Sequence, residues 1–588
     1  MTTVTAESPA LIAEIHVAVG DEIASGGILV STELMKMRHD IRAPHDGIVK
    51  NVHVTLGQEL AGGEALVTLT PATVTAVSAP EATADDERLS EYHARMALLE
   101  DAARPEAVAK RHAKGFRTAR ENLADLFDAE SFVEYGALAV AAQRSKRPLE
   151  TLNAQTPADG IICGTGTVVG RPVAALAVDY TVLAGTQGYF HHKKMDRLID
   201  VAGRQNLPIV LFAEGGGGRP NDHDTEHLVA AGLNITSFRH FARHRGPKIG
   251  IAAGYCFAGN AALFGVCDLR IATEQSFIGM GGPAMIEGGG LGVVAPTEIG
   301  PSAVQTRTGV IDLLTANEAG AVRAAKIALA LTTPDNAPPH DPEPLRGIIP
   351  ADRRQAYAMR DVITALADAG SFLELRRDFG IGMITGFLRI EGRAMGLVAN
   401  NPLHLGGAID APAGDKAARF LQLCDAWGLP VLSLCDTPGF MVGPEVEATG
   451  QVAHISRLFL AGAHFGQPLV TVILRKAYGL GAMAMAGGGF DRPDYCCAWP
   501  SGEIGAMGLE GAVRLGYRDH LAALPEEARA VEFQRLLDEM ITRGKALNAA
   551  SLLEFDAVID PAETRAKVTA ALKTAGPCTP GNRYVDAF

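Results

Sequence analysis

One lysine stands out as a candidate for covalent chemistry, because similar sequences flank it on both sides. Lys36 lies between Met35 and Met37. The segment 15–30 aligns with the segment 52–67 without a gap. Short alternating apolar runs punctuated by glycine are typical of strands and turns. We therefore predict two interlocking half-barrels, with Lys36 on the hairpin between them.

This segment resembles the biotinyl carrier domain of biotin-dependent carboxylases, in which a biotin protein ligase acylates the lysine of a Met-Lys-Met turn. The resemblance runs from about residue 8 to residue 70 and includes the Ala-Pro-His-Asp-Gly-Ile-Val segment at 43–49. It implies a small all-β barrel over residues 1–70, with biotin attached covalently to Lys36. The residue before the first methionine is usually small in this family and is Leu34 here. A lipoyl domain shares the architecture, but its turn usually lacks the flanking methionines.

The composition bounds the class of protein. A chain of 588 residues is long enough for several domains. Its 47% hydrophobic residues and 65 glycines fit close-packed α/β layers. The net charge of -14 and the lack of a long Lys/Arg run argue against a nucleic-acid partner. None of the eight cysteines forms a Cys-x-x-Cys motif, which favours reduced cytoplasmic thiols over a disulfide framework or a zinc ribbon.

Neither a targeting segment nor a membrane span is expected. The N-terminus lacks a basic stretch followed by an apolar one, so we expect no signal peptide. The apolar run 249–267 is long enough to cross a bilayer, and Asn260 is its one strongly polar residue. The run is built from glycine and alanine rather than leucine, however, and would make a poor lipid-facing helix.

Residues 71–86 lack apolar periodicity and are predicted to be a flexible linker. At ~3.3 Å per residue such a linker stretches to roughly 50 Å, which would let a carrier visit two distant sites. The following residues, 87–127, are predicted to be helical from a partial apolar face.

The rest of the chain is a second duplication. An offset of 222 residues superposes Gly386 on Gly164, Gly392 on Gly170, Gly407 on Gly185, Lys416 on Lys194, Pro430 on Pro208, Asp436 on Glu214, Gly439 on Gly217 and Gly481 on Gly259. Strand-like runs alternate with helical ones at 172–178, 195–205 and 208–212, and again at 395–399, 416–427 and 430–434. This alternation predicts an α/β fold in each half.

Four segments of the later half resemble the carboxyltransferase subunit of acyl-CoA carboxylases. They are residues 414–420, 435–440, 472–479 and 498–500, and the segment 112–120 resembles the entry segment of the same family. The resemblance implies two crotonase-like halves, each a spiral of ββα units, at 87–345 and 346–588. The earlier half departs from the family at 213–220, which holds four consecutive glycines, and at Phe257, an additional residue after Cys256.

Carboxyl transfer from carboxybiotin to a thioester places negative charge on the biotin oxygen and on the enolate oxygen. Backbone N–H groups at a glycine turn that leads into a helix suit both charges. The duplication supplies two such turns, 258–261 and 480–483. The resemblance implies that Gly259 and Asn260 hold the thioester carbonyl, and that Gly481 and Ala482 hold the biotin carbonyl. A purely structural role in tight helix–strand packing stays open for these glycines.

Other catalytic motifs are missing from the sequence. It contains no Gly-x-Ser-x-Gly, no His-Glu-x-x-His and no Gly-Lys-Ser/Thr, so we expect no serine nucleophile, no metal site and no phosphate loop. The resemblance implies that the biotin nitrogen itself takes the α-proton. The segment 191–194 (His-His-Lys-Lys) either meets the phosphates of coenzyme A or lies in a solvated loop, and the repeat partner Lys416 favours a structural role for Lys194.

These features predict the carboxyltransferase component of a cytoplasmic acyl-CoA carboxylase of lipid metabolism. No ATP-binding region is recognisable, so we expect a separate biotin carboxylase subunit. The family resemblance implies a homohexameric core, built as a dimer of trimers. Two alternatives stay open: a biotin-dependent acyl-CoA decarboxylase paired with a sodium-pumping membrane subunit, and a catalytically silent scaffold that presents biotin. The sequence does not reveal which acyl-CoA is the substrate.

Overall fold

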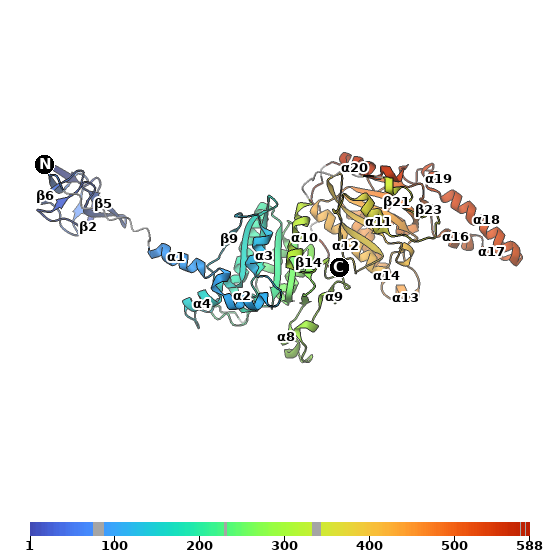
Figure 1. Ribbon diagram of the computed structural model, residues 1–588, viewed down its shortest axis with the longest axis horizontal. Helices are drawn as coiled ribbons and strands as arrows, with labels where there is room; N and C mark the ends of the chain where they lie inside the picture. The colour runs from blue at the N-terminus through green and yellow to red at the C-terminus, as the bar shows by residue number, and fades with distance from the viewer. Residues whose placement is uncertain (75–86, 228–231, 332–340, 342, 577, 582–583) are drawn as a thin grey trace. The chain divides into compact units, whose positions relative to one another are not determined.

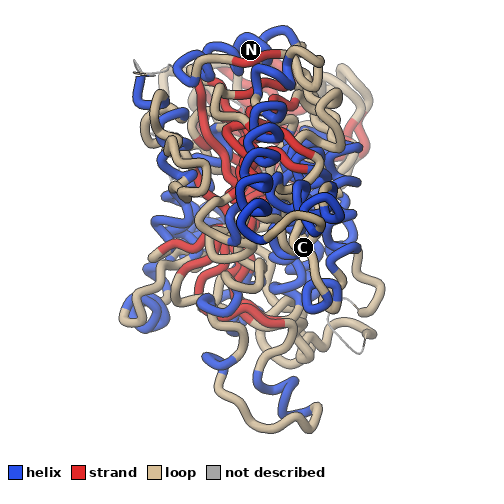
Figure 2. The backbone as a smooth tube through the Cα atoms, turned by 90° about the vertical axis from the view of Figure 1, so that its right-hand side faces the viewer, coloured by secondary structure: helices blue, strands red, loops and turns tan. Residues whose placement is uncertain are grey.

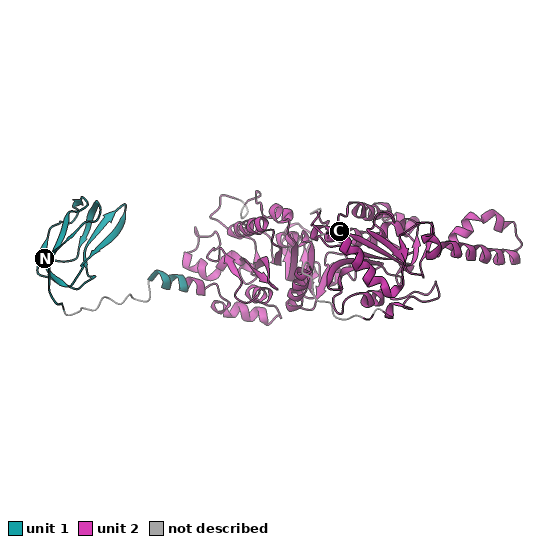
Figure 3. Cartoon of the chain, turned by 90° about the horizontal axis from the view of Figure 1, so that it is seen from above, with its two compact units in different colours: residues 1–94 teal, residues 95–588 magenta. Residues whose placement is uncertain are grey.

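The computed structural model describes residues 1–74, 87–227, 232–331, 341, 343–576, 578–581 and 584–588. It divides into two compact units, residues 1–94 and residues 95–588 (Figure 3). Residues 75–86, which make up most of the predicted linker, lie outside the described residues.

The first unit is a barrel of two four-stranded sheets, with strand orders β1-β8-β6-β3 and β5-β4-β2-β7. The strands are β1 (Thr2–Thr5), β2 (Ala10–Ile15), β3 (Glu22–Ile23), β4 (Ile28–Leu34), β5 (Met37–Arg42), β6 (Gly47–Val52), β7 (Glu59–Leu60) and β8 (Ala65–Pro71). Strand β2 of the first repeat pairs with β7 of the second, and β3 pairs with β6. Leu29 and its repeat partner Leu66 are both fully buried. The predicted interlocking half-barrels are therefore confirmed.

The second unit contains two eight-stranded sheets, one in each half of the duplication. The first sheet has the order β16-β14-β13-β12-β11-β10-β9, with β15 beside β13, and the second has the order β17-β18-β19-β20-β21-β22-β24, with β23 beside β21. Each sheet starts with an antiparallel hairpin and continues with parallel strands. Crossover helices join parallel strands, as expected for an α/β fold.

The strands of the second unit are β9 (Val133–Tyr135), β10 (Ile161–Val168), β11 (Arg171–Val178), β12 (Ile209–Gly215), β13 (Lys248–Phe257), β14 (Leu269–Thr273), β15 (Phe277–Gly279), β16 (Leu313–Thr315), β17 (Leu373–Leu375), β18 (Met383–Ile390), β19 (Arg393–Asn400), β20 (Val431–Thr437), β21 (Leu469–Tyr478), β22 (Tyr495–Ala498), β23 (Glu503–Gly505) and β24 (Ala557–Val558).

The described helices are α1 (Glu87–Ala97), α2 (Pro105–His112), α3 (Ala119–Leu126), α4 (Leu149–Gln155), α5 (Tyr189–Gln205), α6 (Ser237–Arg243), α7 (Gly259–Gly265), α8 (Pro283–Gly288), α9 (Ser302–Gln305), α10 (Glu318–Ala330), α11 (Met359–Leu366), α12 (Ala411–Trp427), α13 (Pro444–Glu447), α14 (Gln451–His464), α15 (Gly479–Met485), α16 (Leu509–Gly516), α17 (Arg518–Ala522), α18 (Glu526–Gly544), α19 (Ala546–Ala550) and α20 (Thr564–Thr574). Helices α16, α17 and α18 project from the second half (Figure 1), and Figure 2 views the chain from that side.

The long helices α5 and α12 show how closely the two halves agree. Both have seventeen residues, and both end at a residue in the left-handed conformation, Asn206 (φ 52°) and Gly428 (φ 67°). This conformation is a common helix stop, since it lets the following N–H groups reach the last carbonyls of the helix. The offset of 222 predicted from the sequence therefore holds for these helices and their caps.

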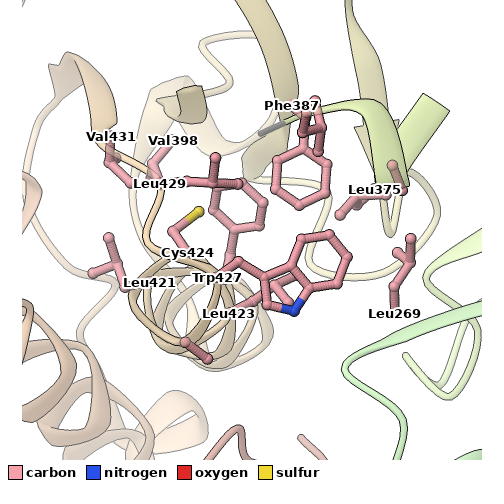
Figure 4. Packing of buried hydrophobic residues seen from close by; sticks show 14 of the residues in the cluster. Leu269, Leu375, Phe387, Val398, Leu421, Leu423, Cys424, Trp427, Leu429 and Val431 are labelled. Carbon is pink, nitrogen blue, oxygen red and sulfur yellow. The ribbon is translucent and has the colours of Figure 1, made fainter. Parts of the chain in front are cut away.

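The two halves share one hydrophobic core. Leu269 of the first sheet belongs to the same buried cluster as Phe387 and Trp427 of the second half (Figure 4). The rings of Phe387 and Trp427 stack with centroids 5.7 Å apart and planes 9° apart. The indole Nε1 of Trp427 also donates to Asp268 Oδ2 of the first half at 3.2 Å. Of the halves predicted at 87–345 and 346–588, residues 95–345 and 346–588 thus lie in one compact unit, while residues 87–94 are grouped with the barrel.

The segment 87–127, predicted to be helical from the sequence, contains the helices α1, α2 and α3. It is interrupted because Pro105 starts α2 and Thr118 caps α3 with its side chain. The apolar run 249–267 is divided between the buried strand β13 and the short helix α7. Among the described helices, none has the length and hydropathy needed to cross a bilayer.

Candidate active site

Lys36 lies at the tip of the hairpin between β4 and β5. Leu34 pairs with Met37 across the strands, so Met35 and Lys36 form a two-residue turn. Both turn residues have positive φ, 51° and 64°, which is the signature of a type I′ turn. The side chains of Met35, Lys36 and Met37 are exposed, and that of Met35 is 91% exposed. The turn therefore presents the Lys36 amine to solvent.

A chain of polar side chains fixes this hairpin to the barrel. His16 Nε2 lies 2.8 Å from Ser31 Oγ, and Ser31 Oγ donates to Asp40 Oδ1 at 2.8 Å. These residues come from β4, β5 and the end of β2. Since Ser31 is buried, the hairpin is anchored at its base while its tip stays accessible.

The turn predicted in the first half lies where β13 enters α7. Gly259 is the first residue of the helix, after Ala258 with φ of 50°. Ala262 donates the first helical hydrogen bond to the carbonyl of Ala258. The backbone N–H groups of Gly259 and Asn260 precede this bond, so they have no acceptor within the helix. A Cβ on Gly259 would lie 2.2 Å from Gln187 Oε1, so any side chain there would displace the amide of Gln187.

The side chain of Asn260 is fully buried and saturated with hydrogen bonds. Its Nδ2 lies 3.1 Å from the carbonyl oxygen of Gly185, 3.0 Å from that of Glu214 and 2.7 Å from that of Gly216. Its Oδ1 accepts from Gln187 Nε2 at 2.9 Å. The backbone N–H of Asn260, and not its side chain, is therefore available as an oxyanion donor. The hydrogen bonds of the Asn260 side chain and its contact with Gln187 were not predicted from the sequence.

The turn predicted in the second half lies where β21 enters α15. Gly479 starts the helix with φ of 53°, and Gly481 and Ala482 are its third and fourth residues. A Cβ on Gly481 would lie 2.7 Å from Gly439 Cα. The helix start is thus packed directly against the loop that follows β20.

The structure corrects the register of the two turns by one residue. In the parallel pairs, Gly215 faces Cys256 in the first half, and Thr437 faces Ala477 in the second. The offset of 222 thus becomes 221 after β12, because the first half has one more residue between β12 and β13. The positions of Gly259 and Asn260 therefore correspond to Leu480 and Gly481, and the superposition of Gly481 on Gly259 is wrong.

The same register explains Phe257. Strands β13 and β21 each have ten residues, and Phe257 and Tyr478 both end their strands. Phe257 is therefore not an extra residue relative to the second half. The positive φ that turns the chain into the helix falls on Ala258 and Gly479, one residue further on.

A buried acid is the next-to-last residue of the strand beside each turn, Glu214 in β12 and Asp436 in β20. Arg111 Nη1 donates to Glu214 Oε1 at 3.0 Å, and Arg475 Nη2 lies 3.2 Å from Asp436 Oδ2. Burial raises the pKa of Glu214 to about 7, against the opposing effect of the Arg111 charge. The offset of 222 superposes the two acids, but nothing in the sequence identifies Arg111 as a partner.

Residues 191–194 lie in the first turns of α5, and the structural role expected for Lys194 is confirmed. Lys194 is buried and donates to the carbonyl of Ala158 at 2.9 Å, as its repeat partner Lys416 donates to that of Arg376 at 2.7 Å. His191 and His192 are buried as well. Of the four residues, only Lys193 is exposed.

A cavity of about 790 Å³ opens beside α15. Its apolar lining includes Ala482, Met483, Phe490, Ile504, Met507, Met540, Leu552 and Leu553, and Arg543 and Glu554 also line it. Methionine side chains adapt to ligands of irregular shape. An apolar group could therefore bind in this cavity, next to the second turn.

Both units match known families. Residues 110–576 match the carboxyl transferase domain, and residues 1–69 match the biotin-requiring enzyme domain. The chain is 33% identical to the propionyl-CoA carboxylase beta chain of Saccharopolyspora erythraea, over 86% of this chain and 95% of that protein.

Two solved structures are similar over most of the chain. A single-chain, multi-domain long-chain acyl-CoA carboxylase has 49% identity and a TM-score of 0.78, covering 97% of this chain. The chain spans only 58% of the length of that enzyme. Transcarboxylase 12S, solved as a hexamer with methylmalonyl-coenzyme A bound, has 30% identity and a TM-score of 0.74, covering 86% of this chain and 99% of that protein.

Proposed function

The chain belongs to the carboxyl transferase family of biotin-dependent acyl-CoA carboxylases, and we propose that it is the component that delivers the carboxyl group to the α-carbon of an acyl-CoA in the cytoplasm. It is an enzyme of this class, with biotin as its covalent cofactor and an acyl-CoA as its substrate. Its two crotonase-like halves follow the biotinyl barrel. The observation that carries the proposal is the presence of both domains in one chain.

Lys36 is the residue that we propose for biotin attachment. Its amine is exposed on a type I′ turn between two methionines, so a ligase can reach it. Bound there, biotin carries the carboxyl group between a biotin carboxylase and this chain.

The two helix starts supply the donors that carboxyl transfer needs. The N–H groups of Gly259 and Asn260 would stabilise the enolate oxygen of the acyl thioester, since they have no acceptor within α7. The backbone N–H groups of Gly481 and Ala482 would donate to the biotin carbonyl. The corrected register adds Leu480, because Leu480 and Gly481 hold the positions of Gly259 and Asn260.

We further propose that the acyl chain is long. The support is the 49% identity to a long-chain acyl-CoA carboxylase. The apolar cavity of about 790 Å³ lies beside α15, the helix whose start is assigned to biotin, so it would receive the acyl chain of a thioester bound at the first turn of a neighbouring copy. Burial of each CH₂ group contributes about 0.8 kcal/mol, so a cavity of this kind favours longer chains.

We also propose that this chain works with a separate biotin carboxylase subunit. Its own copies would form a homohexameric core, built as a dimer of trimers. A hexamer is described for the transcarboxylase 12S relative. Reacting atoms must come within ~3–3.5 Å, whereas the two turns belong to different sheets. An antiparallel second copy would bring the first turn of one chain to the second turn of its neighbour. The active site would then be shared between chains.

The test is reconstitution. The biotinylated chain is combined with a biotin carboxylase, ATP, bicarbonate and either acetyl-, propionyl- or palmitoyl-CoA. We expect carboxylated product only when the carboxylase is present, and the highest kcat/KM for palmitoyl-CoA. ATP-dependent carboxylation by the purified chain alone would contradict the separate subunit. Co-purification with a polytopic membrane protein instead would favour the decarboxylase.

A further inference from the structure

The loop that follows β12 is unusual because it has almost no side chains of its own. Gly215, the last residue of β12, has φ of 105°, and residues 216–218 of the loop are also glycine. Glycine gives a loop more conformational freedom than any other residue. A loop of this composition needs contacts from elsewhere to keep one shape.

Asn260 provides these contacts. Its amide nitrogen lies within hydrogen-bond distance of the carbonyl oxygens of Glu214 and Gly216, where the glycine loop begins. It also lies within hydrogen-bond distance of the carbonyl oxygen of Gly185. The two amide hydrogens are shared among three oxygens, so the group is held from three directions. Gln187 fixes the orientation of the Asn260 amide, because its Nε2 donates to Asn260 Oδ1. Asn260 is 0% exposed and Gln187 is 1% exposed.

Gln187 is itself joined to the glycine loop through its backbone. Its N–H donates to the carbonyl of Gly217 at 3.0 Å, and its carbonyl accepts from Arg219 at 2.7 Å. The side chain of Gln187 also packs on Gly259. The loop, Gln187 and the start of α7 therefore form one hydrogen-bonded assembly with Asn260 at its centre.

The loop after β20 in the second half is held by a different set of contacts. Gly481 holds the position of Asn260, and its Cα side faces Gly439 directly. The loop there contains Thr437 and Pro438, and Gly439 N–H donates to Thr437 Oγ1 at 3.1 Å. Proline and this hydrogen bond stiffen the loop from within. Gln451 Nε2, from α14, also donates to the carbonyls of Ile409 and Met441 at 3.3 and 3.2 Å. The first half differs in that its supporting amide comes from the start of the helix that carries the proposed donors.

We propose that Asn260, oriented by Gln187, is a positioning residue for carboxyl transfer, which holds the glycine loop and the first turn of α7 in the geometry that the acyl thioester needs. This inference rests on the proposed function. A displacement of about 1 Å at such a site costs up to ~10²-fold in rate. The effect should fall on kcat, since contacts made mainly in the transition state change kcat more than KM.

The experiment measures kcat and KM of variants in the reconstituted holoenzyme. The substrate is palmitoyl-CoA, or propionyl-CoA if the wild type turns over propionyl-CoA faster. Asn260→Gly, which copies the second half, and Asn260→Asp, which turns a carboxylate towards three carbonyls, should each lower kcat by roughly 10–100-fold. KM for the acyl-CoA should stay within about threefold. Gln187→Leu removes the hydrogen bond to Asn260 Oδ1 and should also lower kcat, by a smaller factor. If the Asn260 variants do not fold, the kcat of Gln187→Leu tests the positioning role.

Gln467→Leu is the matched control. Gln467 is also a buried amide, and its Nε2 donates to Asp425 Oδ1 at 2.9 Å and to the carbonyl of Thr579 at 2.7 Å. It precedes β21, at the opposite end of this strand from the turn into α15. We expect Gln467→Leu to lower the melting temperature without changing kcat. Full kcat in folded Asn260→Gly and Gln187→Leu would overturn the positioning role, and so would an equal fall in kcat for Gln467→Leu. Failure of the wild-type chain to transfer carboxyl groups would overturn the proposed function itself.

Discussion

The Nε atom of Arg376 donates to Oδ1 of Asp312 at 2.8 Å, and this hydrogen bond joins the two halves of the second unit. Asp312 is almost completely buried and also lies 3.3 Å from Arg270 and 3.2 Å from Arg419. One carboxylate thus meets three guanidinium groups, which hold its pKa well below its usual range. This carboxylate is therefore one of the contacts that hold the two halves together, beside the shared core and the bond from Trp427 to Asp268.

We therefore expect Asp312→Asn to destabilise the second unit. Removing one partner of a buried charged cluster typically costs about 3–5 kcal/mol, because the remaining charges stay buried. Glu539→Gln is the control, since its pair with Arg535 is about half exposed and should contribute about 0.5 kcal/mol or less. Chemical denaturation of both variants measures the difference. Equal stability of the two variants would contradict the role assigned to Asp312.

Buried histidines predict a loss of stability in acid. Burial lowers the pKa of His192 to about 4, and burial lowers that of His191 well below its usual value. Because both pKa values are depressed in the folded state, the unfolded state binds more protons below the ordinary value of 6.5. Stability should be fully present above pH 6.5 and should fall as the pH approaches 4.

His191→Phe tests this expectation. Within the described residues, neither ring nitrogen of His191 has a hydrogen-bond partner. The variant removes a charge that cannot be accommodated in acid, so its melting temperature should fall less between pH 6.5 and pH 4 than that of the wild type. His464→Gln, at an exposed position, should leave the pH profile unchanged. A profile for His191→Phe identical to the wild type would show that His191 does not contribute to the acid sensitivity.

Lys36→Arg should abolish biotinylation and carboxylation together. The arginine keeps the positive charge and the turn, but a guanidinium group is not acylated by a biotin ligase. Lys50→Arg, at another exposed lysine of the barrel, should leave both properties intact. Streptavidin binding and intact mass after expression with an active ligase provide the measurement. An unmodified wild-type chain with full activity would rule out Lys36 as the biotin site.

The shared active site predicts complementation between two inactive variants. Gly259→Val and Gly481→Val should each abolish activity, because a Cβ would lie 2.2 Å from Gln187 Oε1 in one case and 2.7 Å from Gly439 Cα in the other. Co-expression should restore partial activity, since some sites would receive both intact turns. Gly265→Val is a control within α7, because no heavy atom lies within 4 Å of its Cβ position. If folded, co-assembled mixtures stay inactive at every ratio, the two turns do not meet across an interface.

The barrel and the α/β character of both halves could be predicted from local patterns along the chain. Repeats and apolar periodicity are local signals, and they place Lys36 on its hairpin and pair Leu29 with Leu66 in one core. The offset of 222 likewise predicts the equivalence of α5 and α12. The four residues predicted for the two turns all lie at helix starts, as expected, and their roles as donors stay predictions.

How these parts fit together could not be predicted from such local patterns. The change of register after β12 depends on the length of a connection, so a gap-free alignment aligned Gly481 with Gly259 instead of Asn260. The contacts of Asn260 with Gln187, and of Asp312 with Arg376, join residues 73 and 64 positions apart. Such contacts follow no periodic pattern, because each one is set by which polar groups remain to be satisfied once the sheets have packed.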